Sequence, residues 1–143
     1  MRMFAIAAAL ALAASVTAVQ SQERSPSPPG AKVYFENLKD GAKVTNPVTV
    51  KFGIKGMTLA PAGTKMENSG HHHLLIDTDL PADLSKPLPV VENKIVHFGK
   101  AQTETTLTLS PGKHTLQLLL ADQNHIPHDP PVFSKKITIT VTQ

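Results

Sequence analysis

The stretch VTVKFGI, residues 48–54, decides the fold class because apolar and polar residues alternate along it. In an extended chain Val48, Val50 and Phe52 share one face, and the polar residues between them share the other. This period of two is typical of a half-buried strand in an antiparallel sheet. The same period recurs in KVYFE (residues 32–36), TTLTL (105–109) and KITITVT (136–142). More continuous apolar runs, as expected of central strands, are HHLLID (72–77) and HTLQLLLAD (114–122), and KIVHF (94–98) is a shorter candidate.

Turn signals separate these seven segments, and no segment has a sustained helical period. The turn signals are Asp40-Gly41, Asn46-Pro47, Pro61-Ala62-Gly63, Pro81, Pro111-Gly112 and Pro130-Pro131. About seven short strands in roughly 100 residues are typical of an immunoglobulin-like antiparallel β-sandwich, so we predict this all-β fold. A small barrel is the alternative.

The start of the chain predicts export. Arg2 precedes an apolar, alanine-rich run and then small residues up to Ala18, which is the pattern of a secretory signal peptide. The run is shorter than the roughly 20 residues of a spanning helix, so we expect no membrane span after cleavage. We therefore predict a signal peptide over residues 1–18, a flexible Pro/Ser-rich spacer over 19–30 and one β-sandwich domain over 31–143. The expected location is the periplasm or the cell exterior.

The composition narrows the function. The sequence has no cysteine, which excludes disulfides and thiolate metal ligands. Its formal net charge of +3 comes from dispersed residues without a basic cluster, so we expect no nucleic-acid partner. Neither Ser69 nor Ser110 lies in a nucleophile-elbow motif, and no glycine-rich phosphate loop is present. We therefore expect a binding protein and not an enzyme.

Histidine is concentrated in three short segments of the chain. Three histidines stand together at residues 71–73, His97 follows in a second segment, and the third contains His125 and His128. If Leu74 and Ile76 face the core, then His72 faces it as well, because side chains alternate along a strand. His71, His73 and Asp77 then emerge together on the opposite face. Leu75 on that same face leaves this assignment ambiguous.

The segment HIPHDPP, residues 125–131, predicts a stiff loop that presents imidazoles. Its prolines restrict the backbone, which lowers the entropy lost when side chains converge on a ligand. Imidazole nitrogens suit late transition metals. We predict a metal site formed by His71, His73, His97, His125 and His128, with copper as the expected ion and zinc as the second candidate.

Two histidines have simpler explanations than metal binding, and the whole set has one alternative function. His72 fits a hydrogen-bonded core histidine, and His114 fits a solvated strand start. The whole set of histidines also fits a non-metal envelope interaction or ligand-binding module, in which they are structural and fix loops around an envelope protein partner.

The motifs GHHHLLID and HxPHDPP, together with residues 30–63 and 97–141, closely resemble a family of small secreted bacterial proteins known only as a domain of unknown function. The resemblance implies the domain boundaries and the choice of histidines, and it implies no activity. The segment LKDGAKVTNPVTVKF, residues 38–52, is more weakly similar to periplasmic copper-resistance carrier proteins, which are β-sandwiches with histidine-based copper sites. Those carriers use a histidine at the mature N-terminus, whereas this chain has no histidine before His71.

Overall fold

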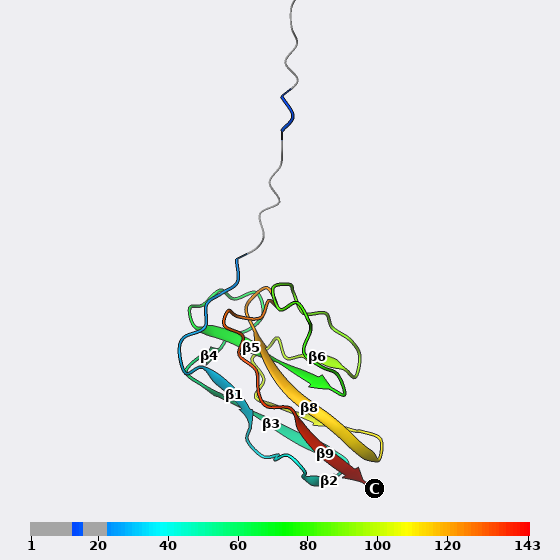
Figure 1. Cartoon of the computed structure of the whole chain (residues 1–143). Coiled ribbons are helices and arrows are strands. Elements are labelled where there is room, and N and C mark those ends of the chain that lie inside the picture. Colours follow the sequence, from blue (N-terminus) through cyan, green and yellow to red (C-terminus); the bar gives the residue numbers. More distant parts are fainter. Residues whose placement is uncertain (1–12, 16–22) are drawn as a thin grey trace, which may run out of the picture.

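The computed structural model describes residues 13–15 and 23–143, so most of the predicted signal peptide and its cleavage point lie outside the described residues. The described part contains nine strands and no helix, which confirms the predicted all-β class (Figure 1). No helix in residues 13–15 and 23–143 is long and apolar enough to cross a membrane.

The strands form a sandwich of two sheets. The smaller sheet has the order β1-β3-β7 and is antiparallel. Its strands are β1 (Lys32–Phe35), β3 (Val48–Lys55) and β7 (Glu104–Leu107). Each of these strands overlaps a segment in which apolar and polar residues alternate.

The larger sheet has the order β2-β9-β8-β5-β4, and β6 pairs with β5 beside this path. Its strands are β2 (Lys43–Thr45), β9 (Ile137–Thr142), β8 (Gly112–Ala121), β5 (Ser69–Ile76), β4 (Thr58–Leu59) and β6 (Ile95–His97). Figure 1 shows the long strands β8 and β9 side by side. The pairs β2-β9 and β4-β5 are parallel, so the sheet is mixed, whereas the sequence predicts antiparallel strands only. The short strands β2 and β4, which create these pairs, are absent from the sequence prediction.

The main core lies between the two sheets. Register places Leu74 opposite Leu118, and both side chains are fully buried in this core. Val50 and Phe52 of β3 contribute from the smaller sheet. The predicted facing of the central strands is therefore correct, since Leu74 and Leu118 point inward.

A second apolar layer covers the outer face of the β5-β8 pair. Leu75 and Leu119 on that face pack against Leu88, which belongs to the long connection between β5 and β6. This connection also supplies Leu80 and Leu84. The pair is therefore buried on both faces, and every residue of β5 is buried. Because both faces are buried, Leu75 is apolar although it lies on the outer face with His71 and His73, and this is why the sequence left the facing of the strand ambiguous.

Residues 24–27 form an N-terminal strap against the loop that follows β8. Ser25 Oγ donates to Asp122 Oδ2 at 2.7 Å, and Ser25 O accepts from Asp129 N at 3.0 Å. Arg24 donates to the carbonyl oxygens of residues 127 and 128. The prediction of a flexible spacer is therefore wrong for this segment. Its backbone is free to pair because an extended Pro-rich chain makes no hydrogen bonds of its own.

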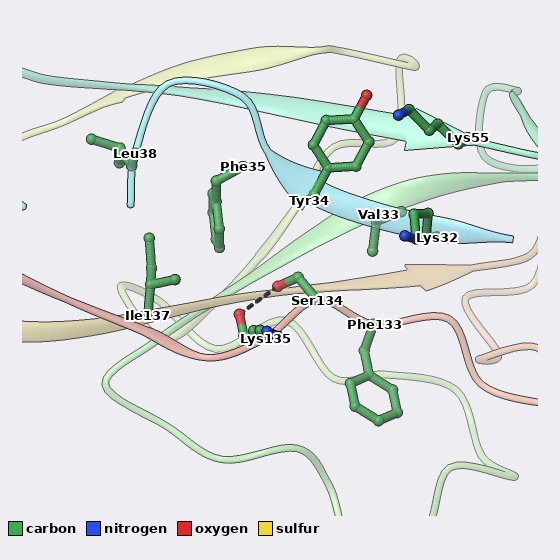
Figure 2. Close-up of a pocket in the computed structure, with 10 residues that line it drawn as sticks. All are labelled: Lys32, Val33, Tyr34, Phe35, Leu38, Lys55, Phe133, Ser134, Lys135 and Ile137. Carbon is green, nitrogen blue, oxygen red and sulfur yellow. Dashed lines mark hydrogen bonds between the residues drawn. The ribbon is translucent and has the colours of Figure 1, made fainter. Parts of the chain in front are cut away.

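One side of the sandwich is open, because β1 forms the edge of the smaller sheet. Figure 2 shows the residues that lie between β1 and the segment leading into β9. Val33 and Phe35 point from β1 toward that segment, whereas Tyr34 turns the opposite way.

Candidate metal centre

Strand register brings three of the histidines together. His71 and His73 are two residues apart on β5, so their side chains share the outer face of the larger sheet. His97 on β6 lies directly opposite His73. Directly opposed residues of an antiparallel pair point to the same side, so His97 joins the other two. The predicted convergence of the histidines on β5 and β6 is thus produced by the β5-β6 pairing.

The fourth histidine comes from the loop after β8, where Asp122 shapes the backbone. Asp122 Oδ1 accepts from the amides of Asn124 and Ile126 at 2.9 and 3.1 Å. Asp122 O accepts from His125 N at 2.9 Å, and His125 adopts a left-handed conformation with a φ of 62°. Side-chain bonds from Asp to nearby amides are a common way to fix a tight turn. This turn directs His125 toward β5.

The four imidazoles have the spacing of a ligand set. His71, His73, His97 and His125 each offer one nitrogen, and these four atoms all lie within 4.8 Å of one another. His71 Nε2 is 3.1 Å from His125 Nδ1 and 3.1 Å from His97 Nε2. Ligands bonded at about 2.0 Å to a tetrahedral ion are about 3.3 Å apart. The two 3.1 Å separations are close to this value, and wider separations, which reach up to 4.8 Å, would have to shorten for one ion to bind all four nitrogens.

Hydrogen bonding among the rings does not satisfy all of their nitrogens. A neutral imidazole nitrogen either donates one hydrogen or accepts through one lone pair. His71 Nε2 therefore pairs with only one of its two close neighbours at a time. His71 Nδ1 and both nitrogens of His73 are buried without a hydrogen-bond partner among the described residues. Such unpaired buried groups are costly unless a ligand satisfies them.

The environment keeps the imidazoles of His71, His73 and His97 neutral. Burial, followed by the neighbouring His97 and His125, lowers the pKa of His71 to about 4. Burial and the other three rings lower the pKa of His73 to about 3, and burial also lowers the pKa of His97. A neutral imidazole is the form that binds a metal ion. At neutral pH these rings therefore carry free lone pairs.

The cluster is closed on the sheet side and accessible on the other. His71 and His73 are 0% and 1% exposed, whereas His97 and His125 are half-buried. Gly99 leaves the space for the His97 ring, since a Cβ at residue 99 would lie 2.4 Å from His97 Cε1. An ion would therefore enter past His97 and His125.

His128 lies outside the cluster, although the sequence predicts it as a ligand. Its Nε2 lies 2.9 Å from Ser69 O, and its side chain is fully buried. Gly70 provides room for this ring, because a Cβ there would lie 2.9 Å from His128 Cε1. The HIPH spacing does not reveal that the left-handed backbone at His125 sends the two rings to different places.

His72 and His114 also lie apart from the cluster. His72 points into the main core, where its ring centroid is 5.1 Å from that of Phe52. The prediction of a core histidine is therefore correct, and none of the described residues supplies a hydrogen bond to its nitrogens.

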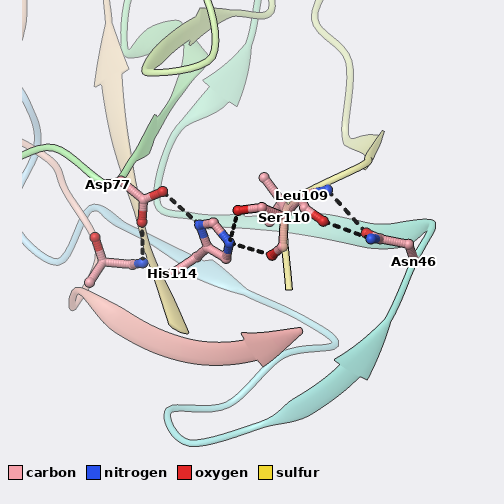
Figure 3. A network of polar contacts seen from close by, with 6 residues as sticks. Asn46, Asp77, Leu109, Ser110 and His114 are labelled. Atoms are coloured by element: carbon pink, nitrogen blue, oxygen red, sulfur yellow. Dashed lines mark hydrogen bonds and ion pairs between the residues drawn. The ribbon is translucent and has the colours of Figure 1, made fainter. Parts of the chain in front are cut away.

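His114 belongs to a polar network instead of a solvated strand start (Figure 3). Its Nδ1 lies 2.6 Å from Asp77 Oδ2, and this contact raises the pKa of His114. Its Nε2 is 2.7 Å from Ser110 O and 3.3 Å from Ser110 Oγ. An Nε2–H that donates to the carbonyl oxygen is unable to accept the hydroxyl proton. Through its contacts with Asp77 and Ser110, His114 connects the end of β5 to the turn before β8.

Two residues that shape the site are not among those predicted from the sequence. Asp122 shapes the loop of His125, and Gly99 makes room for His97. The sequence signal for Asp122 is its position at the start of DQNH, where an Asp commonly begins a turn. No comparable signal marks Gly99, because its role depends on which ring lies beside it.

Fold and site together define a small all-β protein with a four-histidine cluster on the outer face of one sheet. The chain belongs to the family described as "Domain of unknown function (DUF4399)", whose model matches residues 50–142. Membership of an uncharacterised family is thus confirmed, and the matched range contains every histidine of the cluster. No curated protein and no solved structure matches the chain significantly. The similarity to copper-resistance carriers stays a prediction.

Proposed function

We propose that this protein binds one transition-metal ion, copper in preference to zinc, through His71, His73, His97 and His125. The observation that carries the proposal is the convergence of four imidazole nitrogens within 4.8 Å, with no acid in the set. Neutral nitrogen ligands favour late transition metals over the calcium and magnesium ions that oxygen ligands select.

The preference for copper follows from the ligand type. Nitrogen sites bind divalent first-row metals in an order that peaks at Cu²⁺ and falls at Zn²⁺. The sequence has no cysteine to form a thiolate-based structural zinc site. The half-buried His97 and His125 leave the ion accessible, which suits a protein that takes up and releases metal more than one that uses it to stabilise the fold.

We place this activity in the periplasm or outside the cell and assign it to binding, not catalysis. The signal-peptide pattern over residues 1–18 supports export. N-terminal sequencing of the exported protein tests this placement, because cleavage near Ala18 is expected. An uncleaved, membrane-retained product would contradict it.

The alternative is an interaction module whose histidines are structural. The 3.1 Å contacts among His71, His97 and His125 are compatible with a hydrogen-bond network. The geometry around His71 favours the metal instead, because its Nε2 can form a hydrogen bond with only one of its two close neighbours at a time, whereas one ion can bind all three nitrogens.

Calorimetric titration of metal-stripped, tag-free protein tests the proposal. We expect one Cu(II) per chain, bound more tightly than Zn(II). His125→Ala should weaken copper binding by at least about 100-fold, because loss of a mere outer-shell partner already costs roughly 10–100-fold. His128→Ala is the matched control from the same loop, and His114→Ala is a second control on another face.

Elemental analysis of the purified protein checks the stoichiometry independently. Copper binding no tighter than millimolar would exclude the metal site and leave the interaction module. Equal losses from His125→Ala and His128→Ala would show that the loop as a whole is required, which would contradict the four-residue ligand set.

A further inference from the structure

A groove of about 420 Å³ lies on the open side of the sandwich (Figure 2). Strand β1 forms one wall, and the segment that leads into β9 forms the other. The residues that line it are Lys32, Val33, Tyr34, Phe35, Leu38, Lys55, Phe133, Ser134, Lys135 and Ile137. The proposed metal site uses none of them.

The backbone of β1 turns unpaired groups toward this groove. Glu36 N donates to Lys51 O of β3, and hydrogen-bonded residues alternate along an antiparallel pair. Phe35 lies opposite Phe52, whose amide donates to Thr103 O on the far side of β3. The backbone groups of Phe35, and of Val33 by the same alternation, therefore point to the free edge. No other described strand pairs with that edge.

The opposite wall presents a second stretch of free backbone. Ser134 N donates to Leu118 O, and Leu120 N donates to the carbonyl oxygen of Val132. These bonds attach the segment to β8 on either side of Phe133. The backbone groups of Phe133 accordingly point away from β8, and its side chain is 44% exposed. The free edge of β1 and the free backbone at Phe133 thus border one groove.

The side chains around the groove indicate the chemistry of its occupant. Val33, Phe35 and Ile137 give it an apolar floor. Lys32, Lys55 and Lys135 stand at its rim, and no acidic residue lines it among the described residues. A cationic rim attracts an anionic partner. Lysines at a sheet edge also disfavour pairing with a second copy of this chain, because the two edges would repel each other.

We propose that the groove binds an extended acidic segment of a partner protein, which adds to β1 as a new edge strand. The free backbone of Val33 and Phe35 supplies the hydrogen bonds of strand addition. Alternate apolar side chains of the segment fill the floor, and its carboxylates meet the lysines. The four residues of β1 offer an edge of about 13 Å, enough for a short segment.

Solution NMR with a defined peptide tests this proposal. The probe is an acetylated peptide of about seven alternating Glu and Val residues, long enough to cover the edge. We expect saturable binding and slower hydrogen exchange at the amides of Val33 and Phe35. A peptide with Lys in place of Glu should bind at least about tenfold more weakly, because its charges repel the rim.

Charge-reversed variants separate the groove from general attraction to a basic protein. The double variant Lys32→Glu with Lys135→Glu should weaken binding of the Glu/Val peptide at least about tenfold. The control, Lys43→Glu with Lys113→Glu, changes two exposed lysines outside the groove and should leave binding within about twofold. His73→Ala should also leave it unchanged, so the result does not depend on metal binding.

Three outcomes would overturn the proposal. Absence of peptide binding is the first, and equal loss in the groove and control variants is the second. The third is binding without protection of the Val33 and Phe35 amides. If decanoate binds in the groove while the peptide leaves those amides unprotected, the site holds a small anionic amphiphile and strand addition is wrong.

Discussion

His71 is the residue around which the cluster is organised. Its Nε2 is the one nitrogen placed 3.1 Å from two other imidazoles of the described chain. Its position on a central strand, buried on both faces, fixes this nitrogen more firmly than a loop position would. His97 and His125 belong to less buried segments, so their rings can move to fit an ion.

At the same scale, Gly99→Ala should weaken copper binding at little cost to stability. The new methyl carbon would clash with the His97 ring, so the ring must leave the position in which its Nε2 lies 3.1 Å from His71 Nε2. The backbone at Gly99 has no positive φ, so alanine brings no conformational strain there. We expect a loss of about 10–100-fold in copper affinity, which is the usual effect of changing a residue that positions a metal ligand. Calorimetric titration measures the affinity, and thermal denaturation measures the stability.

Lys100→Ala is the control for this prediction, since Lys100 is exposed next to Gly99. It should leave copper affinity unchanged. An unchanged affinity in Gly99→Ala would mean that His97 is not a ligand, whereas loss of the folded state would make the glycine structural.

Strand β8 is the element on which the fold depends, because both of its faces are buried. Leu118→Ala should lower the free energy of unfolding by roughly 2–5 kcal/mol, the usual cost of a large-to-small change in a core. Thr140→Ala, on the half-buried outer face of β9, should cost much less. Denaturant unfolding of both variants makes the comparison. Equal losses would contradict the assigned facing of the two strands.

Several strands were predictable from the sequence because their apolar and polar residues alternate, and the central strands β5 and β8 were predictable from their nearly continuous apolar runs. Val50 and Phe52 show the alternating pattern, and each of the seven predicted segments overlaps a strand. The two-residue strand β4 and the three-residue strand β2 are too short to show a period. Their parallel pairing depends on contacts with distant strands, which local pattern does not encode.

The candidate site was only partly predictable, for reasons of the same kind. Alternation places His71 and His73 on one face, and this part follows from sequence alone. The position of His97 opposite His73 depends on the register of β5 with β6, and tertiary packing determines that register. The separation of His125 from His128 depends on one left-handed backbone conformation that no residue-type rule requires at a histidine.

For the whole molecule, the metal-free protein should lose stability as the pH falls from about 6.5 toward about 4. The pKa of His71 and of His72 is lowered to about 4, and that of His73 to about 3. Below pH 6.5 the unfolded chain binds protons that the folded chain does not. Each such histidine then lowers the free energy of unfolding by up to about 1.4 kcal/mol per pH unit. Chemical denaturation at several pH values measures this slope.

His114 should act in the opposite direction and in a different pH range. Its pKa is raised by Asp77, so its contribution is present below pH 6.5 and is lost as the pH rises through the folded-state value. His72→Leu is the matched variant for the acid slope, because it removes one buried imidazole and leaves the cluster intact. An acid slope that His72→Leu leaves unchanged would contradict the prediction.

A fragment cut to the matched family range, residues 50–142, would not be an autonomous folding unit. It would lack β1 and β2 and would begin inside β3, so the smaller sheet would lose one of its three strands and the larger sheet would lose an edge strand. It would also lack Ser25, so the Asp122 carboxylate that shapes the turn of His125 would lose one of its partners. Recombinant production therefore has to begin no later than Arg24, and an affinity tag added there would lie beside the very loop that carries a candidate ligand.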